Sequence, residues 1–329
     1  MHKPATPSID RRDLIAGLFA GLGAGLALPN VAGAQPVSHG KTVAITFDDL
    51  PFASATEGTD LAEIKAVNRQ VLHTLRAFGA PATGFVVQKS LEPFGPEAPR
   101  ELLASWTQGA FSLGNHTYSH ADTNALDLAG IAREVVDGAA SIKPLMAAAG
   151  KRVRFVRFAM NHTGDTLDKA LAIEALSKTL GYTPAASTID TSDYEFEAAY
   201  RASLRKRDAE ATQRIADAYV AYSAQQIDYY AALGHQVLGY EPPEVALLHL
   251  NRINAATLPR LLQQYVDRGY RFVTLDEAQS DPAYAIPTTY ATKFGPMWGY
   301  RWAKEKDVHV DGSLEKDPPA WITDYAKAG

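Results

Sequence analysis

Residues 43–49 read VAITFDD, five residues typical of a buried strand followed directly by two carboxylates. Short β-branched runs of this kind recur along the chain, and longer amphipathic stretches separate them. In residues 61–78, apolar side chains recur at intervals of three and four, as on one face of a helix. Because strand and helix alternate, we expect parallel strands with helices covering both faces of the sheet.

Seven runs are predicted to be strands, and four segments are predicted to be helical. The predicted strands are Val43–Phe47, Ala82–Val87, Phe111–Asn115, Val153–Phe158, Thr183–Ile189, Val245–Leu250 and Phe272–Leu275. The predicted helical segments are Leu61–Phe78, Leu128–Ala149, Leu167–Leu180 and Glu195–Leu233. With about seven strands, this α/β pattern favours a (β/α)7-type barrel, with an open doubly wound sheet as the alternative, and periodicity alone does not separate the two. In both architectures, active sites lie at the carboxyl ends of the strands.

Composition restricts the classes of function. Of 329 residues, 46% are hydrophobic and 21% are charged, so the chain can bury a sizeable core. Lys and Arg total 32 against 37 Asp and Glu, and the net charge of −5 argues against nucleic acid as the main partner. The absence of cysteine excludes disulfides, thiolate metal sites and cysteine nucleophiles. Any metal ion must therefore be bound by His, Asp, Glu or other oxygen ligands.

The first 34 residues have the pattern of an export signal. Arg11-Arg12 precedes the uncharged run LIAGLFAGLGAGLAL at residues 14–28, and Ala32-Gly33-Ala34 is a suitable cleavage site. Paired arginines before a weakly apolar run favour the twin-arginine route, and hence a periplasmic or secreted protein. An ordinary secretory signal and an uncleaved N-terminal anchor are the alternatives.

After this segment, the barrel is expected over residues 35–280, and a tail at 281–329 is expected to be irregular and to pack on it. A helical insertion at 195–235 precedes the sixth predicted strand. Four tyrosines in the insertion either line a substrate cleft or pack it against the barrel, and packing is the favoured interpretation. They are Tyr219, Tyr222, Tyr229 and Tyr230.

Reactive side chains follow the first and third predicted strands. Asp48 and Asp49 follow the first strand, where two adjacent carboxylates either bind a cation and supply a base or cap the next helix. His116 and His120 follow the third strand. A spacing of four places both imidazoles on one face of a helical turn, where they can bind one ion. Thr117 is expected to form a hydrogen bond within this turn.

Three later strands add further groups. Arg157 ends the fourth strand, and a guanidinium there is expected to pair with a carboxylate. Acidic residues lie at 190–194, after the fifth strand. His249 ends the sixth strand and is either a hydrogen-bonded core residue or a proton donor tuned by a nearby acid. Since the carboxyl ends of parallel strands meet at one end of a barrel, these groups are expected to converge.

These motifs resemble, in type and order, those of the polysaccharide deacetylases, the NodB-homology group or carbohydrate esterase family 4. The residues that carry the resemblance are Thr46-Phe47-Asp48-Asp49, His116-Thr117-Tyr118-Ser119-His120, Arg157, Asp190 to Tyr194 and Leu247-Leu248-His249. The resemblance covers about residues 41–280. It implies a distorted barrel and a metal-dependent hydrolase that removes N-acetyl groups from an N-acetylated sugar, oligosaccharide or cell-wall glycan.

The resemblance also implies roles for individual residues. One divalent ion, most often Zn²⁺ with Co²⁺, Ni²⁺ or Mn²⁺ as alternatives, would be held by Asp49, His116 and His120. Asp48 would take a proton from the attacking water, and Arg157 would keep Asp48 ionised. Protonated His249 would deliver a proton to the departing amine, with Asp193 orienting it. The predicted substrate-binding residues are Leu247, Asn161, His162 and Tyr194.

The segment after Arg157 departs from the family pattern, which usually continues with a proline and an aromatic residue. This chain has Arg157-Phe158-Ala159-Met160-Asn161 instead, a departure that bears on substrate choice rather than on metal binding. Asn161 and His162 are therefore interpreted as substrate contacts, with a solvent-facing loop as the alternative.

Two other functions remain open beside glycan deacetylation. One is hydrolysis of another small amide, imide or acetyl ester by the same residues, and the other is a glycan-binding barrel that has lost catalysis. The expected partners are a carbohydrate substrate and the export machinery, and no oligomeric state is indicated.

Overall fold

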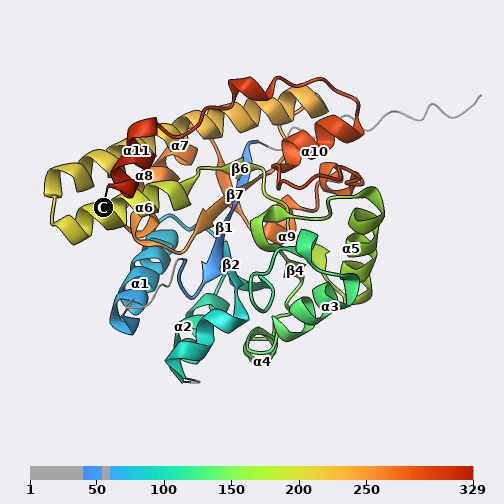
Figure 1. Ribbon diagram of the computed structural model, residues 1–329, viewed down its shortest axis with the longest axis horizontal. Helices are drawn as coiled ribbons and strands as arrows, with labels where there is room; N and C mark the ends of the chain where they lie inside the picture. Colours follow the sequence, from blue (N-terminus) through green and yellow to red (C-terminus); the bar gives the residue numbers. More distant parts are fainter. Residues whose placement is uncertain (1–39, 54–59, 96, 329) are drawn as a thin grey trace, which may run out of the picture. The chain divides into compact units, whose positions relative to one another are not determined.

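The computed structural model describes residues 40–53, 60–95 and 97–328. The export signal predicted at residues 1–34 lies outside the described residues. Strands of a curled sheet occupy the centre of the described domain, and helices surround them (Figure 1). Within these ranges, none of the helices is long and apolar enough to cross a membrane.

The sheet is built around its first strand. The strands are β1 Thr42–Leu50, β2 Ala82–Val86, β3 Phe111–Asn115, β4 Phe155–Val156, β5 Thr183–Pro184, β6 Ile189–Asp190, β7 Glu244–His249 and β8 Arg271–Val273. Their order is β5-β4-β3-β2-β1-β7-β6, β8 pairs with the start of β1, and every pairing is parallel. Almost every side chain of β1 is buried, which explains its continuous apolar run.

One continuous segment, residues 183–190, connects the two ends of this strand order. β5 pairs with β4, whereas β6 pairs with β7. Between them, the Ala185 amide donates to the Val156 carbonyl over 2.7 Å, and the Thr188 amide donates to the Val245 carbonyl over 2.9 Å. The strand predicted at Thr183–Ile189 is thus split into two short pairings. The parallel, curled sheet confirms the predicted distorted barrel and excludes the open doubly wound sheet.

The predicted helices are present, and two of the predicted segments are divided. The helices are α1 Leu61–Ala77, α2 Glu97–Ala104, α3 Leu128–Asp137, α4 Ile142–Ala148, α5 Leu167–Thr179, α6 Asp193–Lys206, α7 Ala209–Leu238, α8 Arg252–Asp267, α9 Leu275–Ala278, α10 Trp298–Glu305 and α11 Ala320–Lys327. The segment predicted at Leu128–Ala149 divides at Gly138 into α3 and α4. The insertion consists of α6 and α7, which meet at Arg207 in a left-handed conformation.

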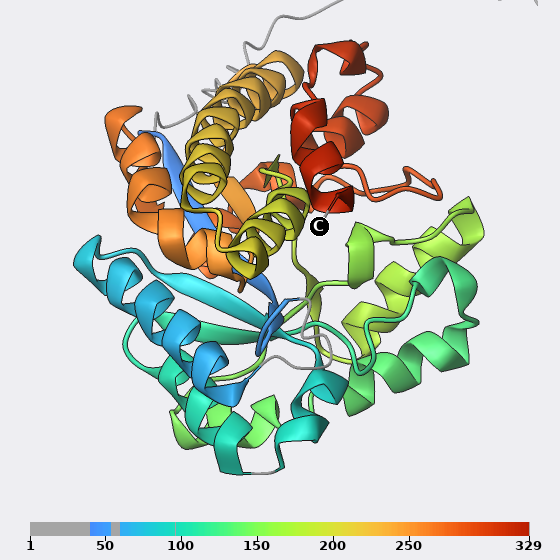
Figure 2. The ribbon, with the colours of Figure 1, turned by 60° about the vertical axis from the view of Figure 1, so that its left-hand side comes forward.

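The insertion packs on the barrel helix α8, which both α6 and α7 contact, and its tyrosines take part in packing, as they were interpreted. Tyr219 and Tyr222 are buried and lie against Phe196 of α6, with ring centroids 5.2 and 5.4 Å apart. The C-terminal tail contains two helices, α10 and α11. Helix α10 contacts α7, and α11 contacts α6 (Figure 2). Glu315, between these helices, accepts hydrogen bonds from the hydroxyls of Tyr230 and Tyr300 over 2.5 and 2.6 Å.

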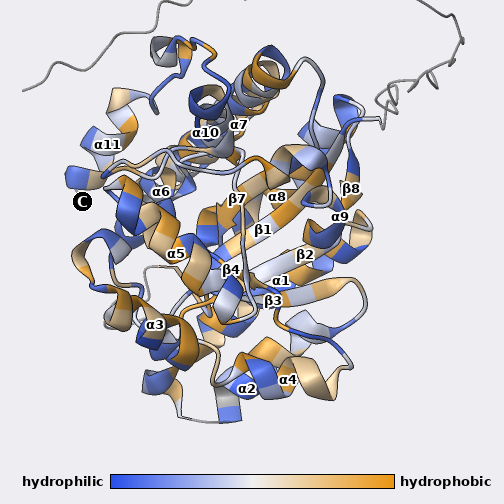
Figure 3. Cartoon of the chain, turned by 90° about the vertical axis from the view of Figure 1, so that its right-hand side faces the viewer, coloured by the Kyte–Doolittle hydropathy of each residue, from blue (hydrophilic) through white to orange (hydrophobic). Residues whose placement is uncertain are grey.

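The buried hydrophobic residues come from the strands and from the helices around them, and hydrophobic and hydrophilic residues alternate along the helices (Figure 3). A charged residue interrupts this interior at the start of β7. Glu244 is 2% exposed, and the Thr188 hydroxyl donates to its carboxylate. Burial raises the pKa of Glu244 to about 8, so the folded protein keeps this carboxyl protonated at neutral pH.

We expect Glu244→Gln to reduce the loss of stability as pH rises from about 5 to about 8. The unfolded chain ionises this carboxyl near its ordinary pKa, whereas the folded protein retains the proton up to about pH 8, so stability falls as pH rises across that window. The fall in Tm between pH 5 and pH 8 should be smaller in the variant by at least about 2 °C. Glu277→Gln, an exposed substitution on α9, is the control, and equal falls in Tm for wild type and Glu244→Gln would contradict this account.

Candidate active site

Three potential metal ligands converge where β1 and β3 end. One ligand atom from each of Asp49, His116 and His120 lies within 4.8 Å of the other two. The Asp49 Oδ1 is 3.5 Å from the Nε2 of His116 and 3.4 Å from the Nε2 of His120. Asp49 has a left-handed backbone with φ of 61°, and the Oδ2 of the preceding Asp48 lies 3.6 Å from the same Nε2 of His116. The convergence predicted for these three residues is therefore present.

His116 is oriented for binding through Nε2. Its ring is buried, and its Nδ1–H donates to the backbone carbonyl of Arg157 over 2.7 Å. With Nδ1 protonated, Nε2 carries the lone pair that a metal ion needs. Burial, followed by the neighbouring His116, lowers the pKa of His120 and so favours its neutral form. Both imidazoles thus suit a divalent cation.

The turn that carries the two histidines differs from the prediction. Residues 116–120 do not form a helical turn, because Thr117 and His120 have left-handed backbones with φ of 67° and 60°. The prediction for Thr117 was also wrong: its Oγ1 is buried without a hydrogen-bond partner among the described residues. The rings are brought together, with centroids 4.9 Å apart, by a strained turn rather than by helical spacing.

Two residues that the sequence did not indicate hold this turn. The Asn115 Oδ1 accepts from the Thr117 amide over 2.9 Å, and its Nδ2 donates to the Val135 carbonyl over 2.8 Å. Glu134 accepts from the amide and hydroxyl of Ser119 over 2.8 and 2.7 Å. The available signal was the asparagine at the end of a strand, a residue that often forms such a turn with the second amide beyond it.

Asp48 lies beside the three potential metal ligands. It pairs with Arg157, as was expected for this guanidinium. The Nη1 of Arg157 donates to the Asp48 Oδ1 and to the Thr46 hydroxyl, both over 2.8 Å, and its Nη2 donates to the Ala186 carbonyl over 2.6 Å. Both members of the ion pair are buried. Burial alone would raise the pKa of Asp48, but Arg157 and the nearby histidines outweigh it and hold the pKa below its ordinary value.

A second pair lies at the end of β7. The Nδ1 of His249 is 2.6 Å from the Asp193 Oδ1, and the His249 amide donates to Oδ2 over 2.7 Å. Burial disfavours the charged imidazole, but buried Asp193 outweighs this and raises the pKa of His249 to about 10. Asn254 also donates to Asp193, and the Tyr219 hydroxyl donates to Asn254 over 2.7 Å. The sequence did not indicate this supporting role of Asn254 and Tyr219.

The predicted substrate-binding residues occupy different environments. Tyr194 is 53% exposed, with its ring centroid 6.1 Å from that of His249, so it lies at the mouth of the site. Leu247 is buried within β7. Asn161 is also buried, and its Oδ1 accepts from a serine hydroxyl over 3.1 Å. His162 is paired with a neighbouring carboxylate over 2.7 Å. The substrate roles of all four remain predictions.

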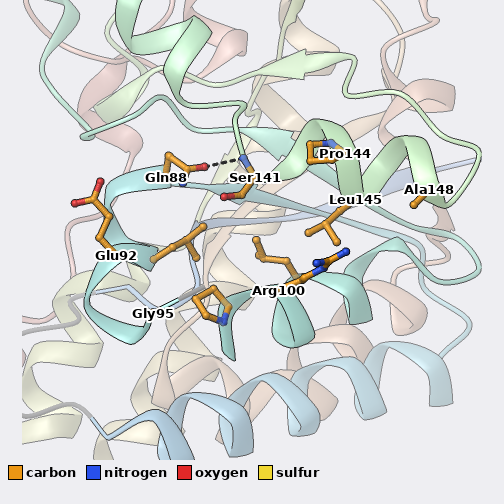
Figure 4. A pocket seen from close by; sticks show the side chains of 11 residues that line it. Gln88, Glu92, Gly95, Arg100, Ser141, Pro144, Leu145 and Ala148 are labelled. Atoms are coloured by element: carbon orange, nitrogen blue, oxygen red, sulfur yellow. Dashed lines mark hydrogen bonds between the residues drawn. The ribbon is translucent and has the colours of Figure 1, made fainter. Parts of the chain in front are cut away.

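A separate cavity of about 570 Å³ lies between α2, α4 and the 3₁₀ segment Gln88–Phe94 (Figure 4). Leu91, Leu103 and Leu145 line it together with Arg100. None of the described residues around it belongs to the predicted site. The hydroxyl of Tyr118 donates to Glu92 over 2.7 Å, so one wall of this cavity contacts the turn of the two histidines.

Comparison with known proteins shows that part of the barrel is similar to polysaccharide deacetylases. A family model described as polysaccharide deacetylase matches residues 36–185. These residues include the three potential metal ligands and Arg157 but end before Asp193 and His249. A chitin deacetylase from Pestalotiopsis sp. is 28% identical over 195 residues, which are 56% of this chain and 57% of that protein. This chain therefore spans little more than half of the length of that relative.

Two solved structures are also similar. A family 4 carbohydrate esterase pseudoenzyme from Bacillus anthracis is 14% identical, with 73% of this chain and 66% of that chain covered and a TM-score of 0.49. A peptidoglycan deacetylase from Bacillus subtilis is 20% identical, with 74% and 93% covered and a TM-score of 0.45. The family match shows a polysaccharide deacetylase domain within residues 36–185, the segment that contains Asp48, the three potential metal ligands and Arg157.

Proposed function

We propose that this protein is a metal-dependent hydrolase that removes N-acetyl groups from an N-acetylated sugar, oligosaccharide or cell-wall glycan. The observation that carries the proposal is the convergence of an ionised carboxylate, a protonated imidazole and three potential ligands at one end of the barrel. The family match supports the reaction class, and the related chitin deacetylase supports a glycan as the substrate.

Asp49, His116 and His120 are the proposed ligands of a divalent cation, and zinc is the favoured ion. Two imidazoles and one carboxylate form a ligand set that zinc binds, and three protein ligands leave coordination positions for water and substrate. Their mutual distances and the orientation of His116 fit this role. The bound ion would polarise the acetyl carbonyl and lower the pKa of the attacking water.

Asp48 is the proposed general base. Arg157 donates to its Oδ1, which leaves Oδ2 to accept the proton of the water that attacks the acetyl carbonyl carbon. The lowered pKa of Asp48 keeps it ionised at neutral pH, so it enters the reaction ready to accept a proton. Arg157 thus holds both the charge and the orientation of the base.

His249 is the proposed general acid. Asp193 binds its Nδ1, so Nε2–H remains available for the leaving nitrogen. As the amide C–N bond breaks, this proton passes to the departing nitrogen, and acetate and a free amine are the products. The pKa of about 10 ensures that His249 is protonated at neutral pH. Tyr194 at the mouth is a proposed contact for the sugar.

We also propose that the protein is exported to the periplasm or secreted. The support is the sequence of residues 1–34, with Arg11-Arg12 before a weakly apolar run. Fractionation of cells that produce the full chain tests this proposal, and recovery only of uncleaved cytoplasmic protein would refute it.

The proposed reaction predicts acetate release that depends on Asp48. Protein loaded with Zn²⁺, Co²⁺ or Ni²⁺ is assayed on acetylated chitooligosaccharides, peptidoglycan fragments, simple acetamides and acetyl esters. We expect acetate and free amine from a glycan substrate, and a decrease in kcat of at least about 10² for Asp48→Asn with the metal still bound. No release from any substrate refutes the function, release only from non-sugar substrates favours the alternative hydrolase, and wild-type activity of Asp48→Asn refutes the base.

The acid assignment predicts a shift in the alkaline limb of the pH profile. Asp193→Asn removes the negative charge that raises the pKa of His249, so His249 loses its proton at lower pH. We expect the alkaline limb of kcat to move down by about one pH unit or more. Asp217→Asn, an exposed substitution on α7, is the control. An unchanged limb in folded Asp193→Asn would show that His249 is not the titrating acid.

The metal proposal predicts that a methyl group at Gly138 weakens binding. A Cβ at this position would lie 2.5 Å from the carbonyl carbon of Thr117 and 2.6 Å from the Asn115 Oδ1, so the histidine turn must shift. Overpacking of this kind costs about 1–3 kcal/mol, and we expect Zn²⁺ affinity measured by calorimetry to fall. Gly312→Ala, whose nearest neighbouring atom would be 3.8 Å away, is the control. Equal affinities for Gly138→Ala and wild type would contradict the role of this turn.

A further inference from the structure

A buried arginine lies in the C-terminal segment, far in sequence from the predicted site. Arg301 of α10 is 1% exposed. Its Nε donates to the Pro296 carbonyl over 3.0 Å, its Nη1 to the Thr163 hydroxyl over 2.6 Å, and its Nη2 to the Asn161 carbonyl over 2.8 Å. The guanidinium also lies 4.6 Å from the ring centroid of Trp298. All three hydrogen-bond acceptors are neutral, and no described carboxylate forms an ion pair with Arg301.

This burial is energetically unfavourable for the charge itself. Burial lowers the pKa of Arg301 to about 10, in the direction expected for a cation that has lost its water without gaining an anion. An apolar side chain would fill the same space without this desolvation cost. The feature that an apolar side chain would not provide is the set of three directed hydrogen bonds. We therefore attribute the burial of Arg301 to the hydrogen bonds by which it holds neighbouring segments together.

The segment that Arg301 holds is the loop at residues 159–164. Met160 and Asn161 have consecutive left-handed backbones, with φ of 56° and 54°, which non-glycine residues rarely adopt. The tail backbone approaches this loop closely, because a Cβ on Gly295 would lie 1.8 Å from the Met160 carbonyl oxygen. The loop conformation thus depends on contacts from the C-terminal segment.

The same loop contacts both sides of the proposed active site. On one side, His162 pairs with Asp122 over 2.7 Å, and Asp122 follows the histidine turn by two residues. On the other side, the Asn161 Oδ1 accepts a hydrogen bond from the Ser187 hydroxyl. The Ser187 carbonyl in turn accepts from the Trp298 amide over 2.9 Å. Ser187 follows Ala186, the residue whose carbonyl binds the guanidinium of Arg157. The tail is thus connected by hydrogen bonds to the residues that surround the base.

We propose that Arg301 is a positioning residue of the active site, which fixes the loop 159–164 as the wall against which the substrate binds. The inference rests on the proposed deacetylase function. It makes the C-terminal segment, which lies beyond the residues matched by the family model, part of the substrate-binding side. The loop presents half-exposed Met160 at its surface, so its position determines what the substrate meets there.

The test compares Arg301→Met, which keeps length but removes the charge, with Arg301→Lys, which keeps the charge, in the full chain. Hydrogen–deuterium exchange of loop amides reports on position, since the Asn161 and His162 amides are hydrogen-bonded within the loop. We expect faster exchange in Arg301→Met and a roughly tenfold to hundredfold fall in kcat/KM, mainly through KM. Arg301→Lys should restore part of both, and Zn²⁺ affinity should stay within about twofold of wild type.

Tyr325→Phe is the control, because it removes a hydrogen bond of the tail to Asp208 that does not involve Arg301 or the loop at residues 159–164. If it reproduces the effect, general loosening of the tail explains the data and the proposal is overturned. Unchanged exchange and KM in Arg301→Met overturn it as well. If Arg301→Met does not fold, Thr163→Val removes one acceptor and should give the same faster exchange. A wild type without acetate release refutes the proposed function, whereas the exchange comparison still decides whether Arg301 holds the loop.

Discussion

The site depends on one buried guanidinium. Arg157 is 1% exposed and donates to the Asp48 carboxylate, to the Thr46 hydroxyl and to the carbonyl of Ala186, while its own carbonyl accepts from His116. Four parts of the chain therefore meet at this residue: β1, the end of β4, the segment that joins the two ends of the sheet, and the histidine turn. Because an unpaired buried charge is strongly unfavourable, Arg157 and Asp48 each require the other. The same ion pair stabilises the barrel mouth and keeps Asp48, the proposed base, ionised.

The two charge pairs have opposite effects on the groups that titrate. The cation of the first pair lowers the pKa of Asp48, and the anion of the second raises the pKa of His249 to about 10. At neutral pH the site consequently holds an ionised carboxylate and a protonated imidazole together with the three potential metal ligands. Such a separation of pKa values allows one site to accept a proton and to donate another. Burial works against both shifts, so the paired residues Arg157 and Asp193 are what produce them.

The sequence predicted the parts of this site that follow from strand order. A buried run ending in Asp48 and Asp49 was recognisable because parallel strands are apolar on both faces and present their last residues at one edge. The turn at residues 116–120 was not predictable from spacing, because hydrogen bonds from Asn115 and Glu134 impose left-handed backbones on it. The change of partner within residues 183–190 was also hidden, since the strands that it pairs with, β4 and β7, are distant in sequence.

The proposed acid and the residues that hold the proposed substrate wall come from the second half of the chain. Asp193 is the first residue of α6, and Tyr219 of α7 supports it through Asn254 of α8, so the inserted helices hold the acid in place. Arg301 contacts Asn161 across 140 positions of sequence, a relation that no local pattern reveals. The potential metal ligands and the proposed base, by contrast, lie within residues 48–157. Changes in the insertion or the tail can therefore alter the proposed substrate wall and the proposed acid while the potential metal ligands stay in place.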